Sequence, residues 1–122
     1  MFTIGTERGP GFLRVVVTGP ADVHEACAGA VYTAELLRRT SSPRVLLDMM
    51  AFAPEFARTD GLDVLSTLYG AMPPLERIAI VIPAGRSHGL VLDVARHRNV
   101  PAREFDDLQQ AEAWLQEAAT SG

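Results

Sequence analysis

Two short segments combine polar side chains with a chain geometry suited to ligand binding. The first is GRSHG at residues 85–89, between an apolar stretch at residues 78–82 and a following helical pattern. Backbone N–H groups at a helix start can hold an anion, and the guanidinium of Arg86 would add positive charge there. Ser87 and His88 supply further hydrogen-bonding groups. The predicted ligand- or anion-binding set is Gly85, Arg86, Ser87 and His88.

The same five residues also have a purely structural interpretation. In it, the segment is a glycine-rich turn, and Ser87 is the N-cap of the next helix. The glycine spacing and lysine of a P-loop are absent, and so is the dinucleotide-binding fingerprint. Both interpretations therefore stay open.

The second segment surrounds Thr59, which precedes a helical pattern starting at Gly61. A hydroxyl there can cap the helix N-terminus, and the helix dipole favours Asp60 beside it. Alternatively, Thr59 is a phosphoacceptor whose phosphate would accept backbone N–H bonds and attract an arginine of a partner. Arg58 could offer its guanidinium to such a phosphate.

An apolar stretch, MMAFAPEF at residues 49–56, precedes Thr59 where a polar turn is expected. Methionine and aromatic side chains suit adaptable partner surfaces and lipid-lined pockets, but the loop could equally fold back as additional core. Right-handed connections would bring it to the same sheet edge as Thr59 and Gly85. The predicted regulatory or partner-binding loop comprises Phe52, Phe56, Arg58, Thr59, Asp60 and Gly61.

Other reactive side chains lack the spacing that metal or catalytic sites require. His24, His88 and His97 include no pair three or four residues apart on one helix, so we predict no metal site. No Gly-x-Ser-x-Gly nucleophile elbow occurs, and the single Cys27 falls in a helical pattern as a small apolar residue. We predict a protein that is not an enzyme and uses no cofactor.

Length and charge narrow the class further. The 122 residues suit a single domain, predicted over residues 1–118, with residues 119–122 frayed. Fifteen acidic and eleven scattered basic residues give a net charge of -4, which argues against nucleic-acid binding. No apolar run approaches the ~20 residues that span a bilayer, and the N-terminus lacks the basic region of a secretion signal. We expect a cytoplasmic protein without an integral membrane segment.

Hydrophobic periodicity predicts an α/β fold. Alternating apolar residues at 2–4 and 13–17, separated by a Gly/Pro turn, indicate an antiparallel hairpin. Asp22 and Glu25 have capping-box spacing before a helix that runs to about Arg39. One predicted face of this helix carries Val23, Ala26, Cys27, Ala30, Val31, Ala34 and Leu37.

The rest of the chain alternates strands and helices. Residues 44–48 and 78–82 are apolar on both faces, as in central parallel strands covered by helices. Helical patterns at 61–72, 90–97 and 108–118, and a short strand at 102–105, complete the series. We expect an open, mostly parallel sheet of about five strands with about four helices and right-handed crossovers.

This pattern resembles the SpoIIAA-like branch of the STAS fold, whose founding members are anti-anti-sigma factors in bacterial partner switching. The resemblance rests on the order of elements and on short matches: Leu47-Asp48, Gly61-Leu62, Arg77-Ile78-Ala79-Ile80-Val81, Phe105-Asp106 and Ala113-Trp114-Leu115. The founding proteins carry Asp-Ser-Ser-Gly-Leu, in which the first serine is phosphorylated. Aligned on Gly61-Leu62, that serine corresponds to Thr59 and the aspartate to Arg58.

The loop before Thr59 is longer than in the founding proteins, and the chain is more similar to the wider SpoIIAA-like group, many of whose members lack the phosphorylation motif. The resemblance implies a non-enzymatic regulatory or protein-interaction module in bacterial signalling. The alternative is a carrier or sensor of a small lipid or anionic ligand, with its pocket at the carboxyl edge of the sheet. We also expect a homodimer, paired through an exposed apolar helix or loop surface.

Overall fold

The structure, a computed structural model, describes residues 1–86 and 89–117. The predictions for Ser87 and His88, and the frayed end predicted for 119–122, lie outside the described residues. Within these residues the strands are β1 (Thr3–Gly9), β2 (Phe12–Ala21), β3 (Arg44–Pro54), β4 (Arg77–Val81) and β5 (Ala102–Phe105). The helices are α1 (Val23–Thr40), α2 (Arg58–Ala71), α3 (Leu90–His97) and α4 (Leu108–Gln116).

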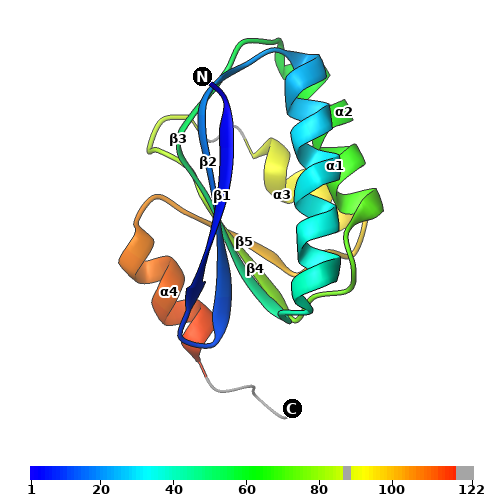
Figure 1. Cartoon of the computed structure of the whole chain (residues 1–122). Coiled ribbons are helices and arrows are strands. Elements are labelled where there is room, and N and C mark those ends of the chain that lie inside the picture. Colours follow the sequence, from blue (N-terminus) through cyan, green and yellow to red (C-terminus); the bar gives the residue numbers. More distant parts are fainter. Residues whose placement is uncertain (87–88, 118–122) are drawn as a thin grey trace.

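The strands form one sheet in the order β1-β2-β3-β4-β5, antiparallel between β1 and β2 and parallel elsewhere. Each parallel strand is added on the same side of the previous one. Right-handed crossovers must then all lie on one face, which explains why α1, α2 and α3 cover the same side. The final helix, α4, lies on the opposite face (Figure 1). The predicted α/β fold is confirmed.

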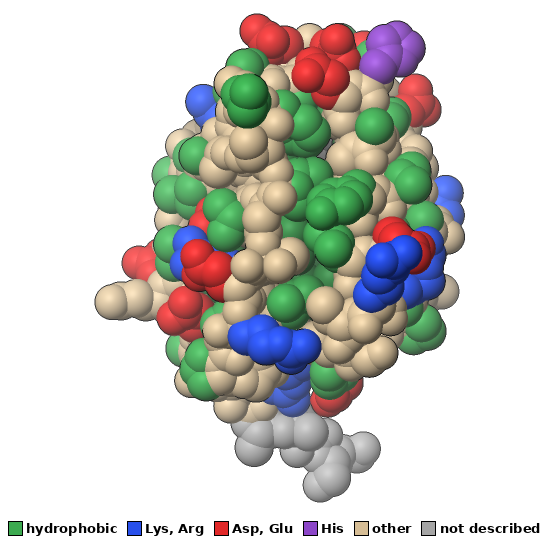
Figure 2. Space-filling view, viewed as in Figure 1, with side chains coloured by type: hydrophobic (Ala, Val, Ile, Leu, Met, Phe, Trp, Pro, Cys, Tyr) green, Lys and Arg blue, Asp and Glu red, His purple; other side chains and the backbone are tan. Residues whose placement is uncertain are grey.

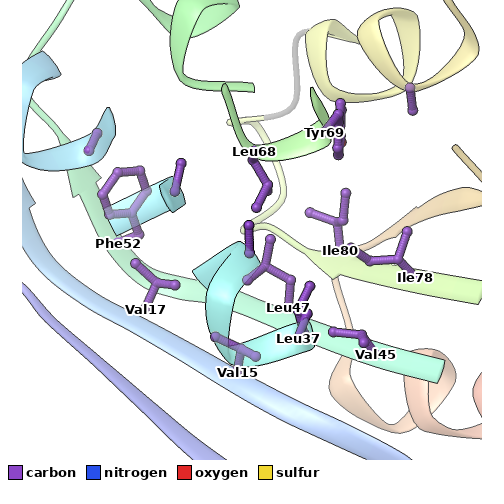
Figure 3. Packing of buried hydrophobic residues seen from close by; sticks show 14 of the residues in the cluster. Val15, Val17, Leu37, Val45, Leu47, Phe52, Leu68, Tyr69, Ile78 and Ile80 are labelled. Atoms are coloured by element: carbon purple, nitrogen blue, oxygen red, sulfur yellow. The ribbon is translucent and has the colours of Figure 1, made fainter. Parts of the chain in front are cut away.

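Two apolar clusters follow from this arrangement. Alternate residues of the central strands face α1, α2 and α3, and Figure 3 shows Leu68 and Tyr69 of α2 directed toward Leu47 and Ile80 of the sheet. The intervening residues face α4, where Leu46 and other side chains pack against Leu115. Burial on both faces explains the uninterrupted apolar sequences of β3 and β4.

The capping box of α1 is confirmed, because Asp22 accepts from the Glu25 amide while the Glu25 side chain accepts from the Asp22 amide. The predicted apolar face is partly wrong. Val31 is 51% exposed, whereas Gly29 and Thr33 are buried. The helix is rotated because Phe2, which precedes β1, and Ile4 of β1 lie against Gly29. A Cβ at this position would come within 2.8 Å of the Phe2 ring.

Figure 2 shows hydrophobic side chains at the surface of the molecule between β1 and α1. On α1, the large apolar side chains of Val31 and Tyr32 are 51% and 52% exposed. The helix therefore presents an apolar surface to the outside as well as to the core.

The loop predicted at residues 49–58 is largely a strand. β3 continues to Pro54, and its last residues pair with Thr18–Ala21 of β2 after a register shift between Val16 and Thr18. Backbone hydrogen bonding to β2 therefore overrides the loop-like sequence. As a result Phe52 is a buried core residue, 8% exposed, whose ring lies 6.0 Å from that of Phe2.

Helix α2 begins earlier than predicted. Its N-cap is Ala57, whose carbonyl accepts from the amides of Asp60 and Gly61, and no side chain caps this end. Thr59 is the second residue of the helix and is exposed, so its predicted N-cap role is wrong. The turn after Pro54 is short enough that the helix starts before the hydroxyl.

Candidate functional site

A cavity of about 470 Å³ lies at the carboxyl end of β3 and β4, beside α2 and α3. Its volume is in the usual range of small-molecule pockets. The lining residues are Met49, Phe52, Ala53, Pro54, Phe56, Ala57, Arg58, Gly61, Val64, Leu65, Ile82, Pro83, Arg86, Val91 and Glu104. Most of these side chains are apolar, so the cavity suits an apolar ligand or an apolar side chain of a partner.

Each wall comes from a different element. The end of β3 supplies Met49 and Phe52, the first turns of α2 supply Val64 and Leu65, and α3 supplies Val91. These residues also pack against the main core, which fixes the shape of the wall. Phe52 belongs to this wall of the cavity because β3 continues past the strand predicted at residues 44–48.

Arg86 joins two sides of the cavity. Its Nη1 donates to the Phe52 carbonyl oxygen at 2.7 Å, tying the segment after β4 to the end of β3. The residue itself is exposed. Arg86 thus lies at the rim, where its remaining N–H groups can meet solvent or an anionic group.

Glu104 is the functional candidate that the sequence interpretation missed. It pairs in register with Ile80, and so its side chain lies on the α2 and α3 face of the sheet. One carboxylate oxygen, Oε2, is buried and has no hydrogen-bond partner among the described residues. Its neighbour Arg103 lies on the other face, with its guanidinium 5.4 Å from the Phe105 ring. Only the strand alternation within residues 102–105 could have suggested this placement.

Tyr69 is buried close to this carboxylate. Burial raises the pKa of the Tyr69 phenol above its ordinary value, and the negative charge of Glu104 raises it further. The hydroxyl is directed to the Val91 carbonyl oxygen at 3.4 Å. Tyr69 therefore stays neutral at physiological pH.

Solved structures of two other proteins are similar to the chain over nearly its full length. An anti-sigma factor antagonist from Mycobacterium paratuberculosis gives a TM-score of 0.68 at 18% sequence identity, with 96% of both chains covered. A DUF3478-family protein with a SpoIIAA-like fold, from Shewanella loihica PV-4, gives 0.60 at 19% identity, with 93% of both chains covered. The chain has the SpoIIAA-like fold. By sequence, it matches no family profile and no curated protein.

The SpoIIAA-like fold brings five of the predicted site residues together around one cavity. They are Phe52, Phe56, Arg58, Gly61 and Arg86. The residue 49–56 segment and the segment after β4 therefore meet at this cavity. They meet because the carboxyl ends of adjacent parallel strands lie at one edge of the sheet.

Three other predicted residues do not line this cavity. Thr59 and Asp60 are absent from its lining, although they belong to the first turn of α2. Gly85 lines a second hollow, beside Phe105 and Gln110 on the α4 side. The helix after it has Gly89 as N-cap, without a side-chain hydrogen bond. Gly85 and Arg86, which were both predicted to bind the anion, therefore line two different hollows.

Two further observations concern sites of other kinds. Among residues 1–86 and 89–117, no three His, Cys, Asp or Glu side chains are grouped so that they could hold a metal ion. No helix in the described part of the chain is both long and apolar enough to cross a membrane.

Proposed function

We propose that the protein is a non-enzymatic, cytoplasmic regulatory module that binds a protein partner. The observation that carries this proposal is its structural similarity to an anti-sigma factor antagonist across 96% of both chains. Because that similarity concerns the fold, the proposed binding surface rests on this chain's own residues.

The proposed partner surface runs from Met50 at the end of β3 to Leu62 in α2. These two side chains are 40% and 43% exposed, although both are large and apolar. Exposed apolar groups near a sheet edge and a helix start are suitable contacts for a partner. Thr59, exposed between them, is the proposed regulatory position.

A variant on the proposed surface and a variant outside it test this proposal. Leu62→Ser changes the proposed surface, whereas Arg39→Ser changes an exposed side chain of α1 that belongs to no proposed interface. We expect Leu62→Ser to weaken retention of the partner in affinity capture roughly tenfold or more, and Arg39→Ser to leave it unchanged. Equal retention by the Leu62 variant and the parent protein would contradict the proposed surface.

Phosphorylation is the proposed means of regulation. A phosphate on Thr59 would lie in the first turn of α2, near the positive end of the helix dipole. In the same assay, Thr59→Glu should alter partner retention and Thr59→Ala should not. Identical retention by both variants would count against regulation at this residue.

A homodimer is proposed through the exposed apolar residues of α1. Val31 and Tyr32 are both about half exposed and lie next to each other. Light scattering should give twice the chain mass for the parent protein and a smaller mass for Val31→Asp. A monomeric parent protein at high concentration is the opposing result.

A second candidate function is supported by the cavity. We propose a carrier or sensor of a small amphipathic molecule, because 470 Å³ of mainly apolar lining is combined with the charged side chains of Arg86 and Glu104. Native mass spectrometry of the freshly purified protein should show a bound small molecule. Consistently unliganded protein that also fails to bind added amphiphiles would argue against this function.

A further inference from the structure

Three charged residues line the cavity, Arg58, Arg86 and Glu104, and the last two differ in their hydrogen bonding. Arg86 already donates to the Phe52 carbonyl oxygen at 2.7 Å. Glu104, in contrast, has a buried Oε2 with no partner among the described residues. A buried acceptor without a donor is unfavourable, and the large majority of such atoms in proteins have partners. The unmet requirement in this cavity is therefore for a hydrogen-bond donor.

The fold keeps Glu104 in this position. Its registered partner Ile80 is buried in the main core, and Ala102, two residues earlier on β5, packs against the same cluster. The neighbouring Arg103 faces the other side, where its guanidinium lies 5.8 Å from the Trp114 ring centre. An ion pair between adjacent residues of β5 is thus prevented by strand alternation.

The buried hydroxyl of Tyr69 does not meet the requirement. Tyr69 directs its hydroxyl toward the Val91 carbonyl oxygen. Its phenol is nevertheless close enough to Glu104 for the carboxylate charge to influence it. Among the described residues Oε2 therefore has no donor, and a molecule in the cavity can supply one.

We propose that the cavity binds a small amphipathic molecule bearing an ammonium group, with that group on the Glu104 carboxylate and the apolar body along Phe52, Phe56 and Leu65. This inference rests on the second candidate function and specifies its ligand class. An ammonium supplies both the donor and the opposite charge, so its hydrogen bond is stronger than one from a hydroxyl. Glu104 repels an anionic head group, which would have to bind near Arg86 instead.

Three amphiphiles of equal chain length test this assignment: decylamine, decanol and decanoate. Binding to the full chain is measured by calorimetry at physiological salt, which screens long-range attraction to the net charge of -4. We expect the amine to bind most tightly and the carboxylate most weakly. Glu104→Gln, which keeps the side-chain shape, should weaken amine binding about 10- to 100-fold.

Asp106→Asn is the matched control, because it removes an exposed carboxylate two residues away that does not line the cavity. It should leave amine affinity unchanged, and circular dichroism should show that both variants are folded. An equal loss in both variants would overturn the proposal, since it would indicate general charge attraction. A folded Glu104→Gln variant that binds the amine as tightly as the parent protein would also overturn it.

Two other results separate this inference from the function on which it rests. In the first, decanoate binds tightly, and this binding is lost in Arg86→Gln but kept in Glu104→Gln. That result would support the carrier function and overturn the ammonium assignment. Failure of all three amphiphiles to bind would overturn both.

Discussion

The ion pair between Arg14 and Asp48 gives the sharpest stability prediction. It joins β2 to β3 on the α4 side of the sheet, with Arg14 Nη2 2.6 Å from Asp48 Oδ2. The Asp48 side chain is 7% exposed and the Arg14 side chain 27% exposed. Asp48 Oδ1 also accepts from the Met50 amide at 3.1 Å. Asp48, the more deeply buried partner, therefore depends more on the ion pair than Arg14 does.

Removing the arginine should cost more than removing the aspartate. Arg14→Met leaves a buried carboxylate with only the Met50 amide, whereas Asp48→Asn leaves an arginine that reaches solvent and Glu7 at 3.6 Å. Breaking a buried pair costs roughly 3–5 kcal/mol. We expect about 3 kcal/mol for Arg14→Met, and about 1.5 kcal/mol for Asp48→Asn because solvent screens the remaining charge.

The pKa of Arg14 is consistent with this coupling. The hydrogen bond to Asp48 raises it above the ordinary value, against an opposing contribution from burial. The guanidinium is therefore charged throughout the accessible pH range, and the loss of its partner cannot be relieved by deprotonation.

The assay is urea unfolding of both single variants and of the double variant Arg14→Met/Asp48→Asn. The double variant should lose less than the sum of the singles, because neither charge remains buried alone. Arg39→Met is the control, since Arg39 is 76% exposed in its pair with Glu35, and should change stability by less than about 0.5 kcal/mol. Additive losses, or a larger loss for Asp48→Asn than for Arg14→Met, would refute the reasoning.

Three further predictions concern the site and its supports. Ala57→Asp should stabilise the protein by about 1 kcal/mol, because it adds an acceptor at the uncapped start of α2, while Thr59→Ala should be nearly neutral in the same urea titration. If Thr59→Ala costs as much as a lost cap, the assigned start of α2 is wrong. Phe52→Ala should destabilise by about 3 kcal/mol because its ring is buried in the core, and a loss below about 1 kcal/mol would instead indicate a loose surface residue. In a Tyr32→Phe variant, absorbance at alkaline pH reports Tyr69 alone. Its raised pKa favours folding below the ordinary value of 10.0, and this contribution is lost as pH rises, so ionisation should coincide with unfolding seen by circular dichroism. A separate ionisation step in folded protein would contradict this.

Local sequence patterns predicted the parts of the fold that depend on neighbouring residues. The capping box at Asp22 and Glu25, the hairpin turn and the apolar strands at 44–48 and 78–82 are all present. Their signals are local because a cap, a turn or a strand buried on both faces imposes a pattern over a few residues. Because strands and helices alternate along the chain and crossovers are right-handed, few strand orders were then possible for the sheet.

Local patterns failed where pairing or packing over a distance decides the outcome. Residues 49–54 look like a loop, but they extend β3 because β2 offers unpaired backbone groups beside them. The buried face of α1 includes Gly29 rather than Val31 because Phe2 needs a close approach there. Neither requirement is visible in the segment on which it acts.

The candidate site shows the same division. The sequence by itself determined that Phe56 and Arg86 follow strands whose carboxyl ends meet at one edge, because parallel strands joined by crossovers must end together. Only the tertiary structure decided that these residues enclose a cavity, that Thr59 lies outside its lining, and that Glu104 belongs to it. The reason is physical: the direction of a side chain on a short strand depends on its register with the neighbouring strand, and the pairing of Glu104 with Ile80 fixes that register.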